Sequence, residues 1–189
     1  MLRSLVGSEM CIRDRSNVRQ LLQDNIRDVA DFPKPGILFK DISHILSNPK
    51  LLQHSIDELT ATSGGQKIDK VVGIDARGFI FASPVALNLD AGFVPVRKQG
   101  KLPWETHSMA YSLEYGENVV EIHKDAILPG ENVLLIDDLL ATGGTAAAAI
   151  KLIKKLDANL VAASFLIELS DLNGRDLLEG TPVNAIVSY

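Results

Sequence analysis

Short apolar runs alternate along this chain with longer segments in which apolar residues recur at helical spacing. The strongest run, 132–137, precedes a small-residue loop at 139–143 and an alanine-rich stretch at 144–156 that predicts a helix. Other apolar runs predict strands at 70–75, 93–96, 160–168 and 183–187. Helical periodicity predicts further helices at 16–30, 49–59, 78–89 and 172–178. This alternation is typical of an α/β fold, with a mostly parallel sheet flanked by helices.

Proline, glycine and charge mark the connections between these elements. Two prolines and a glycine at 31–36 end the first predicted helix, because neither residue type continues one. The segments 109–115 and 118–123 predict a hairpin, and the polar stretch 97–107 before them carries too much charge for a core. With no repeat and no linker, 16–189 is predicted to be one domain.

The first fifteen residues are set apart from the rest because they show no helical or strand period. We interpret 1–15 as a non-native or disordered tail. The string resembles translated sequencing-adapter DNA, and the alternative is a natural untethered terminus.

Composition narrows the function classes. A net charge of −5 without a basic run disfavours nucleic acid and anionic membranes as partners, and no apolar run reaches the ~18 residues of a membrane span. The single cysteine allows neither an internal disulfide nor a cysteine-based zinc site, and the four histidines lie far apart. We expect a soluble protein of the cytoplasm.

The segment 133–145 carries the clearest chemistry. It reads Val133-Leu-Leu-Ile-Asp-Asp-Leu-Leu-Ala-Thr-Gly-Gly-Thr145, a buried strand that ends in two acids and a loop that opens a helix. The N–H groups at such a helix start, with two threonine hydroxyls, favour a phosphomonoester dianion. The predicted phosphate-binding residues are Ala141, Thr142, Gly143, Gly144 and Thr145.

Two acids stand directly before this loop. Asp137 and Asp138 can accept hydrogen bonds from two vicinal hydroxyls or hold a hydrated Mg²⁺ ion. An acid pair beside a phosphate loop predicts a ribose 5-phosphate site. The alternative is a solvated strand end followed by an ordinary turn.

On these residues the chain resembles the phosphoribosyltransferases, and the segments at 31–43, 73–79, 97–103 and 112–116 resemble the branch that acts on adenine. The resemblance implies a type I phosphoribosyltransferase fold with a small hood and a flexible flap hairpin. It implies transfer of the 5-phosphoribosyl group from 5-phosphoribosyl-1-pyrophosphate to adenine, giving AMP and pyrophosphate, with Mg²⁺ held through the substrate. A homodimer is implied as well.

The resemblance also assigns roles around the transferred group. Arg77 is implied to be catalytic and to bind the leaving pyrophosphate, after a cis peptide bond between Asp75 and Ala76. The other residues implied to bind pyrophosphate are Asp75, Ala76, Arg97, Lys98, Lys101 and Tyr115. Glu114, in the flap, is implied to exchange a proton with the purine ring. The residues implied to bind adenine are Leu38, Phe39, Lys40 and Leu169.

Two other functions compete with this reading. One is a non-catalytic regulator that binds phosphoribosyl pyrophosphate, although the acidic balance argues against the DNA contact such a regulator needs. The other is a phosphoribosyltransferase that uses xanthine, hypoxanthine or orotate.

Overall fold

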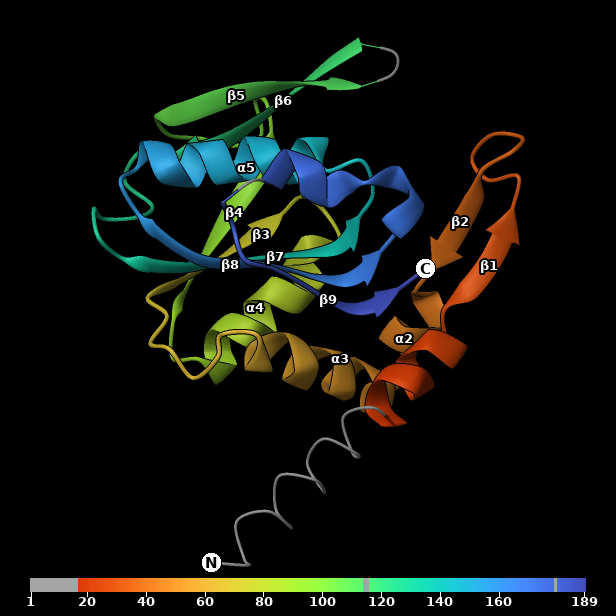
Figure 1. Ribbon diagram of the computed structural model, residues 1–189. Coiled ribbons are helices and arrows are strands. Elements are labelled where there is room, and N and C mark those ends of the chain that lie inside the picture. Colours follow the sequence, from red (N-terminus) through yellow and green to blue (C-terminus); the bar gives the residue numbers. More distant parts are fainter. Residues whose placement is uncertain (1–16, 114–115, 179) are drawn as a thin grey trace, which may run out of the picture. The chain divides into compact units, whose positions relative to one another are not determined.

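The computed structural model describes residues 17–113, 116–178 and 180–189 (Figure 1). The chain forms two compact units, one ending at Glu58 and the other running from Leu59 to Tyr189. Within the described residues, no helix is long and apolar enough to cross a membrane.

The N-terminal unit is built on a small antiparallel pair of strands. A helix at 17–24 is followed by β1 (Arg27–Ala30) and β2 (Leu38–Asp41), with Ala30 opposite Leu38. Then come α2 (Ser43–Ser47) and α3 (Pro49–Ala61), which begins in this unit and ends in the next.

The first predicted helix is too long. It ends at residue 24, where Asn25 donates from its amide side chain to the Leu21 carbonyl at 2.8 Å, and 27–30 form a strand instead. The apolar spacing of 16–30 fits one helix, but the pairing of β1 with β2 satisfies the backbone of 27–30. By contrast, the predicted cap of α3 is present, since the Asn48 side chain accepts from the Lys50 and Leu51 N–H groups.

The C-terminal unit contains a seven-stranded sheet in the order β5-β6-β4-β3-β7-β8-β9. The five strands from β4 to β9 in this order pair in parallel, whereas β6 pairs antiparallel with both β4 and β5. The mostly parallel α/β sheet is therefore confirmed. The strands are β3 (Lys70–Ile74), β4 (Gly92–Lys98), β5 (Thr106–Leu113), β6 (Gly116–His123), β7 (Asn132–Leu140), β8 (Asn159–Glu168) and β9 (Val183–Ser188).

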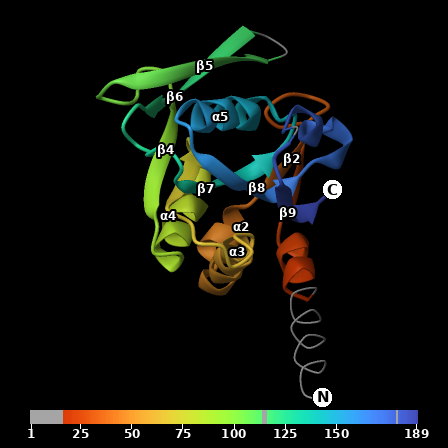
Figure 2. The same cartoon turned by 60° about the vertical axis from the view of Figure 1, so that its left-hand side comes forward.

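Two helices cover opposite faces of this sheet (Figures 1 and 2). They are α4 (Gly78–Asn88) and α5 (Gly144–Lys155), and two short 3₁₀ helices, η1 (Ser170–Leu172) and η2 (Gly174–Leu178), follow β8. On the α4 side, β3 carries Gly73, where a Cβ would lie 2.8 Å from the Ala82 Cβ. A side chain at this position would push α4 away from the strand.

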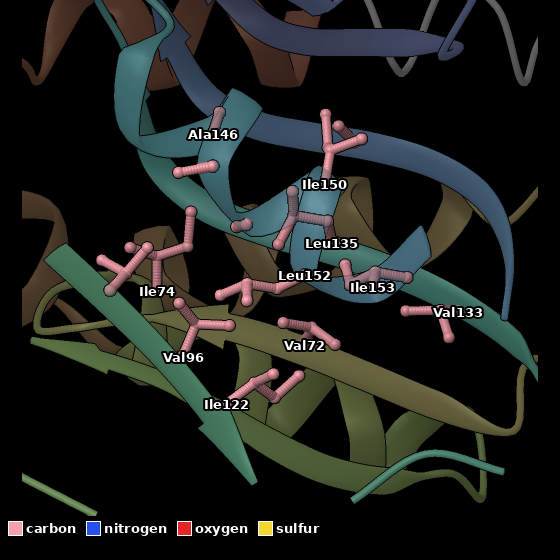
Figure 3. Packing of buried hydrophobic residues seen from close by; sticks show 14 of the residues in the cluster. Val72, Ile74, Val96, Ile122, Val133, Leu135, Ala146, Ile150, Leu152 and Ile153 are labelled. Carbon is pink, nitrogen blue, oxygen red and sulfur yellow. The ribbon is translucent and has the colours of Figure 1, made fainter. Parts of the chain in front are cut away.

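The main core lies between the sheet and α5. Figure 3 shows Leu152 of the helix beside Val72 and Val96 of the sheet, and Ile74 and Ile150 belong to the same buried cluster. These side chains are 4% exposed or less, and their removal from water is the main force that holds α5 on the sheet. The packing fixes the start of α5 beside the end of β7.

Candidate active site

The loop between β7 and α5 forms a hollow at the carboxyl ends of the parallel strands. Gly143 takes a left-handed conformation (φ 82°), which favours glycine, and the Ala147 N–H donates to its carbonyl at 2.8 Å as the helix begins. The hollow has a volume of about 90 Å³. Its lining consists of Asp137, Leu139, Leu140, Ala141, Thr142, Gly143, Gly144, Thr145 and Ala146.

All the residues predicted to bind the sugar phosphate, except Asp138, therefore line one cavity. The first N–H groups of α5 have no acceptor within the helix, and together with the helix dipole they favour an anion here. The strand is longer than predicted, because β7 continues through Leu139 and Leu140, which pair with Ile167 and Glu168 of β8. The loop is correspondingly shorter.

The acid pair lies where β7 and the start of α4 meet. Asp138 is buried, and its Oδ2 lies 2.7 Å from a terminal nitrogen of Arg77, while Asp137 Oδ1 accepts from the Asp138 N–H at 2.9 Å. A Cβ at Gly78 would lie 2.6 Å from Asp137 Oδ1. Only glycine therefore lets α4 begin this close to the acids.

Removal from water raises the pKa of both carboxyls. For Asp137 the negative charge of Asp138 adds to this effect, so its pKa lies well above the ordinary range. Burial also raises the pKa of Asp138, although the Arg77 guanidinium opposes the rise. The site is thus arranged for a ligand that brings hydroxyl donors or positive charge to these oxygens.

A second group of residues lies at the ends of β3 and β4. The Asp75–Ala76 peptide bond is cis, as the resemblance implied, and the Asp75 N–H donates to the Val96 carbonyl at 2.9 Å. Arg97 Nε donates to Asp75 Oδ2 at 3.1 Å, and a terminal nitrogen of Arg97 donates to the Lys101 carbonyl at 3.2 Å. Lys98, the last residue of β4, and Lys101 in the segment after it are both exposed.

Comparison with known proteins agrees with this geometry. Residues 41–176 match the family described as the phosphoribosyl transferase domain. An adenine phosphoribosyltransferase of Mesorhizobium japonicum is 51% identical over 177 residues, which cover 93% of this chain and 98% of that protein. One of Clostridium botulinum is 52% identical over 168 residues, covering 89% of this chain and 98% of that protein.

Solved structures agree as well. The adenine phosphoribosyltransferase of Rhodothermus marinus superimposes with a TM-score of 0.88 at 48% identity, covering 92% of this chain and 99% of that one. The Saccharomyces cerevisiae enzyme, solved with an imino-altritol bisphosphate and adenine, gives a TM-score of 0.86 at 44% identity, covering 90% and 99%. The chain belongs to the adenine phosphoribosyltransferase family.

Three of the residues that family resemblance assigns to adenine lie on β2, in the N-terminal unit. Leu38 is 51% exposed, and the Phe39 ring packs edge-on against Phe32 with centroids 5.1 Å apart. Lys40 is buried, and its ammonium donates to Asp28 Oδ1 at 2.6 Å. The fourth, Leu169, lies in the C-terminal unit.

Leu169 lies directly beside the phosphate loop. Its N–H donates to the Leu140 carbonyl at 2.9 Å, which ties the end of β8 to the residue before the loop. Glu114 and Tyr115, assigned by the family to proton exchange and pyrophosphate, lie outside the described residues. Their neighbours Leu113 and Gly116 pair as the last residues of the predicted hairpin.

Sequence reasoning missed several residues that shape this site. Gly78 is one: it follows Arg77 within the 73–79 segment, but the sequence does not show that the Asp137 carboxylate approaches it. Gly174 and Arg175 are others, since Gly174 packs against the phosphate loop from η2. Nothing in their local pattern distinguishes them from an ordinary helix start.

Proposed function

We propose that this site carries the adenine phosphoribosyltransferase reaction, the transfer of the 5-phosphoribosyl group from 5-phosphoribosyl-1-pyrophosphate to adenine. The products are AMP and pyrophosphate, so the enzyme salvages a purine base. The observation that carries the assignment is the phosphate-sized hollow at the start of α5, next to a buried acid pair that faces Arg77. Identity near 50% over almost the whole chain supports the same reaction.

The sugar phosphate occupies the hollow after β7. The N–H groups at 141–145 and the hydroxyls of Thr142 and Thr145 bind the 5-phosphate, and Asp137 and Asp138 accept hydrogen bonds from the ribose hydroxyls. A hydroxyl donor placed on a buried carboxylate stabilises its ionised form. Substrate binding therefore lowers the pKa values that burial raises in the free protein.

The same acids fit a substrate-held Mg²⁺ ion. Carboxylate oxygens are the ligands that Mg²⁺ prefers, and it keeps several waters when bound with substrate phosphates. Within the described residues no cluster of three or more acidic, histidine or cysteine side chains could cage a metal. Asp137 and Asp138 would hold such an ion through water, and the ion would supply positive charge to the diphosphate.

The leaving pyrophosphate lies over the ends of β3 and β4. Arg77 offers a planar fork of donors to its oxygens, and the backbone after the Asp75–Ala76 bond adds the Ala76 N–H, since the Asp75 N–H is donated to the Val96 carbonyl. Arg97, Lys98, Lys101 and Tyr115 complete this set. Because charge builds on the pyrophosphate as the glycosidic bond breaks, donors fixed in place before the reaction stabilise the transition state.

The base is read by the β2 segment. The backbone of Leu38 supplies one donor and one acceptor to the purine edge, Phe39 stacks on the ring and Lys40 lies beside the site. Leu169 is the further residue that the family resemblance assigns to the base. Glu114 takes the purine proton as N9 bonds to the ribose and returns it in the reverse reaction. Leu38 is half-exposed, so a ligand can reach this segment.

The family resemblance also implies an oligomeric state and a cellular location for this protein. We infer a homodimer that acts in the cytoplasm, since its multiply charged sugar substrate does not cross membranes unaided. Residues 16–189 act as a single catalytic domain, which the family match at 41–176 supports because it crosses the boundary between the two compact units. Neither nucleic acid nor a membrane is a partner.

The test offers each base in turn. The protein is incubated with labelled phosphoribosyl pyrophosphate, Mg²⁺ and adenine, hypoxanthine, xanthine or orotate, and the nucleotide formed is separated and counted. We expect AMP from adenine and little product from the others. Turnover only with another base would reassign the substrate. Tight binding of phosphoribosyl pyrophosphate without turnover of any base would favour a non-catalytic regulator.

A further inference from the structure

The loop after β7 rests against the backbone of η2. A Cβ added to Gly174 would meet the Ala141 carbonyl oxygen and lie 3.0 Å from the Gly143 nitrogen. A Cβ added to Gly143 would meet the Gly174 carbonyl oxygen and lie 3.1 Å from the Gly174 Cα. The two glycines therefore bring the loop and η2 together backbone against backbone, and a side chain on either one would force them apart.

A two-pronged ion pair fixes the start of η2. Arg175 Nε donates to Glu168 Oε1 at 2.5 Å, and a terminal nitrogen donates to Glu168 Oε2 at 2.7 Å. The other terminal nitrogen donates to the Val183 carbonyl at 2.9 Å. Such a fork fixes orientation as well as distance. Because Arg175 directly follows Gly174, this pair determines where the glycine lies.

Glu168 belongs to the strand that borders the phosphate loop. It is 6% exposed and lies opposite Leu140, the last residue of β7. At the other end of η2, Leu178 is buried in the main core. Glu168 thus holds η2 through its carboxylate and borders the end of β7 through the strand pairing, and loss of Arg175 would release the start of η2.

We propose that Arg175 is a positioning residue for the phosphate loop. Through Glu168 it holds Gly174 against residues 141–143, so that the loop N–H groups converge on the 5-phosphate. The proposal rests on the proposed function of this loop as the sugar-phosphate site. Arg175 touches no reacting atom, and its effect comes from geometry, since a misplacement of about 1 Å can cost about 10²-fold in activity.

Arg175→Met tests the proposal against a matched control. Arg19 makes an ion pair with Glu58 at 3.1 Å, and side-chain exposures of 47% and 8% there resemble the 45% and 8% of Arg175 and Glu168. Arg19→Met therefore removes a similar pair from the N-terminal unit, whereas the loop after β7 belongs to the C-terminal unit. Each variant is assayed for melting temperature, for the KM of both substrates, and for ribose 5-phosphate affinity by calorimetry.

We expect both variants to melt earlier, and only Arg175→Met to change phosphate binding. Its KM for phosphoribosyl pyrophosphate and its Kd for ribose 5-phosphate should rise about 10-fold, while the KM for adenine changes less than about 2-fold. Arg175→Lys keeps the charge with a single donor group and should give a smaller rise. It also supplies a folded variant if Arg175→Met does not fold.

Two results would overturn the proposal. One is an unchanged Kd for ribose 5-phosphate in the folded Arg175 variants, and the other is an equal rise in the Arg19→Met control. Wild-type protein is titrated first, which separates this failure from failure of the proposed function. If the wild type itself binds no ribose 5-phosphate, the assignment of the loop is wrong and the role of Arg175 falls with it.

Discussion

Arg77 neutralises a buried carboxylate, and its removal should destabilise the protein in a pH-dependent way. Asp138 has only 8% of its side chain exposed and pairs with Arg77 at 2.7 Å. Breaking a buried ion pair costs about 3–5 kcal/mol. Because the Arg77 side chain is 36% exposed and partly solvated, we expect Arg77→Met to lower the free energy of unfolding by about 2 kcal/mol at pH 8.

The sign of the pH dependence follows from proton linkage. Burial already raises the pKa of Asp138 in the folded state, and loss of the guanidinium raises it further. The folded state then binds more protons than the unfolded state between the ordinary carboxyl pKa and the raised one, so stability falls as pH rises through that window. One pKa unit corresponds to about 1.4 kcal/mol, so the cost of Arg77→Met at pH 5 should be smaller by about 1–2 kcal/mol.

Urea unfolding at pH 5 and pH 8, without substrate, measures this effect. Asp138→Asn removes the charge that needs a partner, so we expect the double variant Arg77→Met/Asp138→Asn to be more stable at pH 8 than Arg77→Met alone. Two results together would refute the reasoning. Arg77→Met would lower the free energy of unfolding equally at pH 5 and pH 8, and adding Asp138→Asn would lower it further. Arg77 would then be a surface arginine with no role as counterion.

Three further predictions concern substrate use. Glu114→Gln should lower kcat by about 10²–10⁴-fold with a much smaller change in the KM for adenine, and retention of more than about half of kcat, with chemistry rate-limiting, would leave Glu114 without an acid–base role. Adenine should be preferred over hypoxanthine by ~10⁴-fold in kcat/KM, because a backbone donor and acceptor at Leu38 cannot satisfy both bases, and comparable values would refute backbone reading. Deletion of 1–15 should leave activity and melting temperature unchanged, whereas a drop of several degrees would show that the segment is part of the fold.

The cavity between β7 and α5 could be predicted because the signals for its strand, loop and helix are contiguous in the sequence. The apolar run of β7, the acids at its end, the small residues after it and the alanine-rich helix all lie within 132–156. Each indicates its own structure without information from elsewhere in the chain. The cavity that Asp137 and 139–146 line agrees with that local pattern. The cis bond at Asp75 came from the family resemblance, since no local pattern encodes it.

The elements that were missed depend on partners far along the chain or on very short signals. Residues 27–30 fit a helical period, and only pairing with 38–41 makes them a strand. The end of β7 was placed too early because the ladder to β8 keeps Leu139 and Leu140 extended. The short helix α2 went unrecognised because it has only five residues, too few to show a period.

Of the three glycines that shape the site, one could be predicted from the sequence and two could not. Gly143 could be predicted, because a glycine before a helix is typical of a phosphate loop. Gly78 and Gly174 could not, since neither has a positive φ and each is required by a backbone or carboxylate from another element. Asp137 constrains the first, and the loop at 141–143 constrains the second. The sequence therefore indicates the candidate groups for the sugar-phosphate site, whereas the glycines that let α4 and η2 approach those groups become visible only in the folded chain.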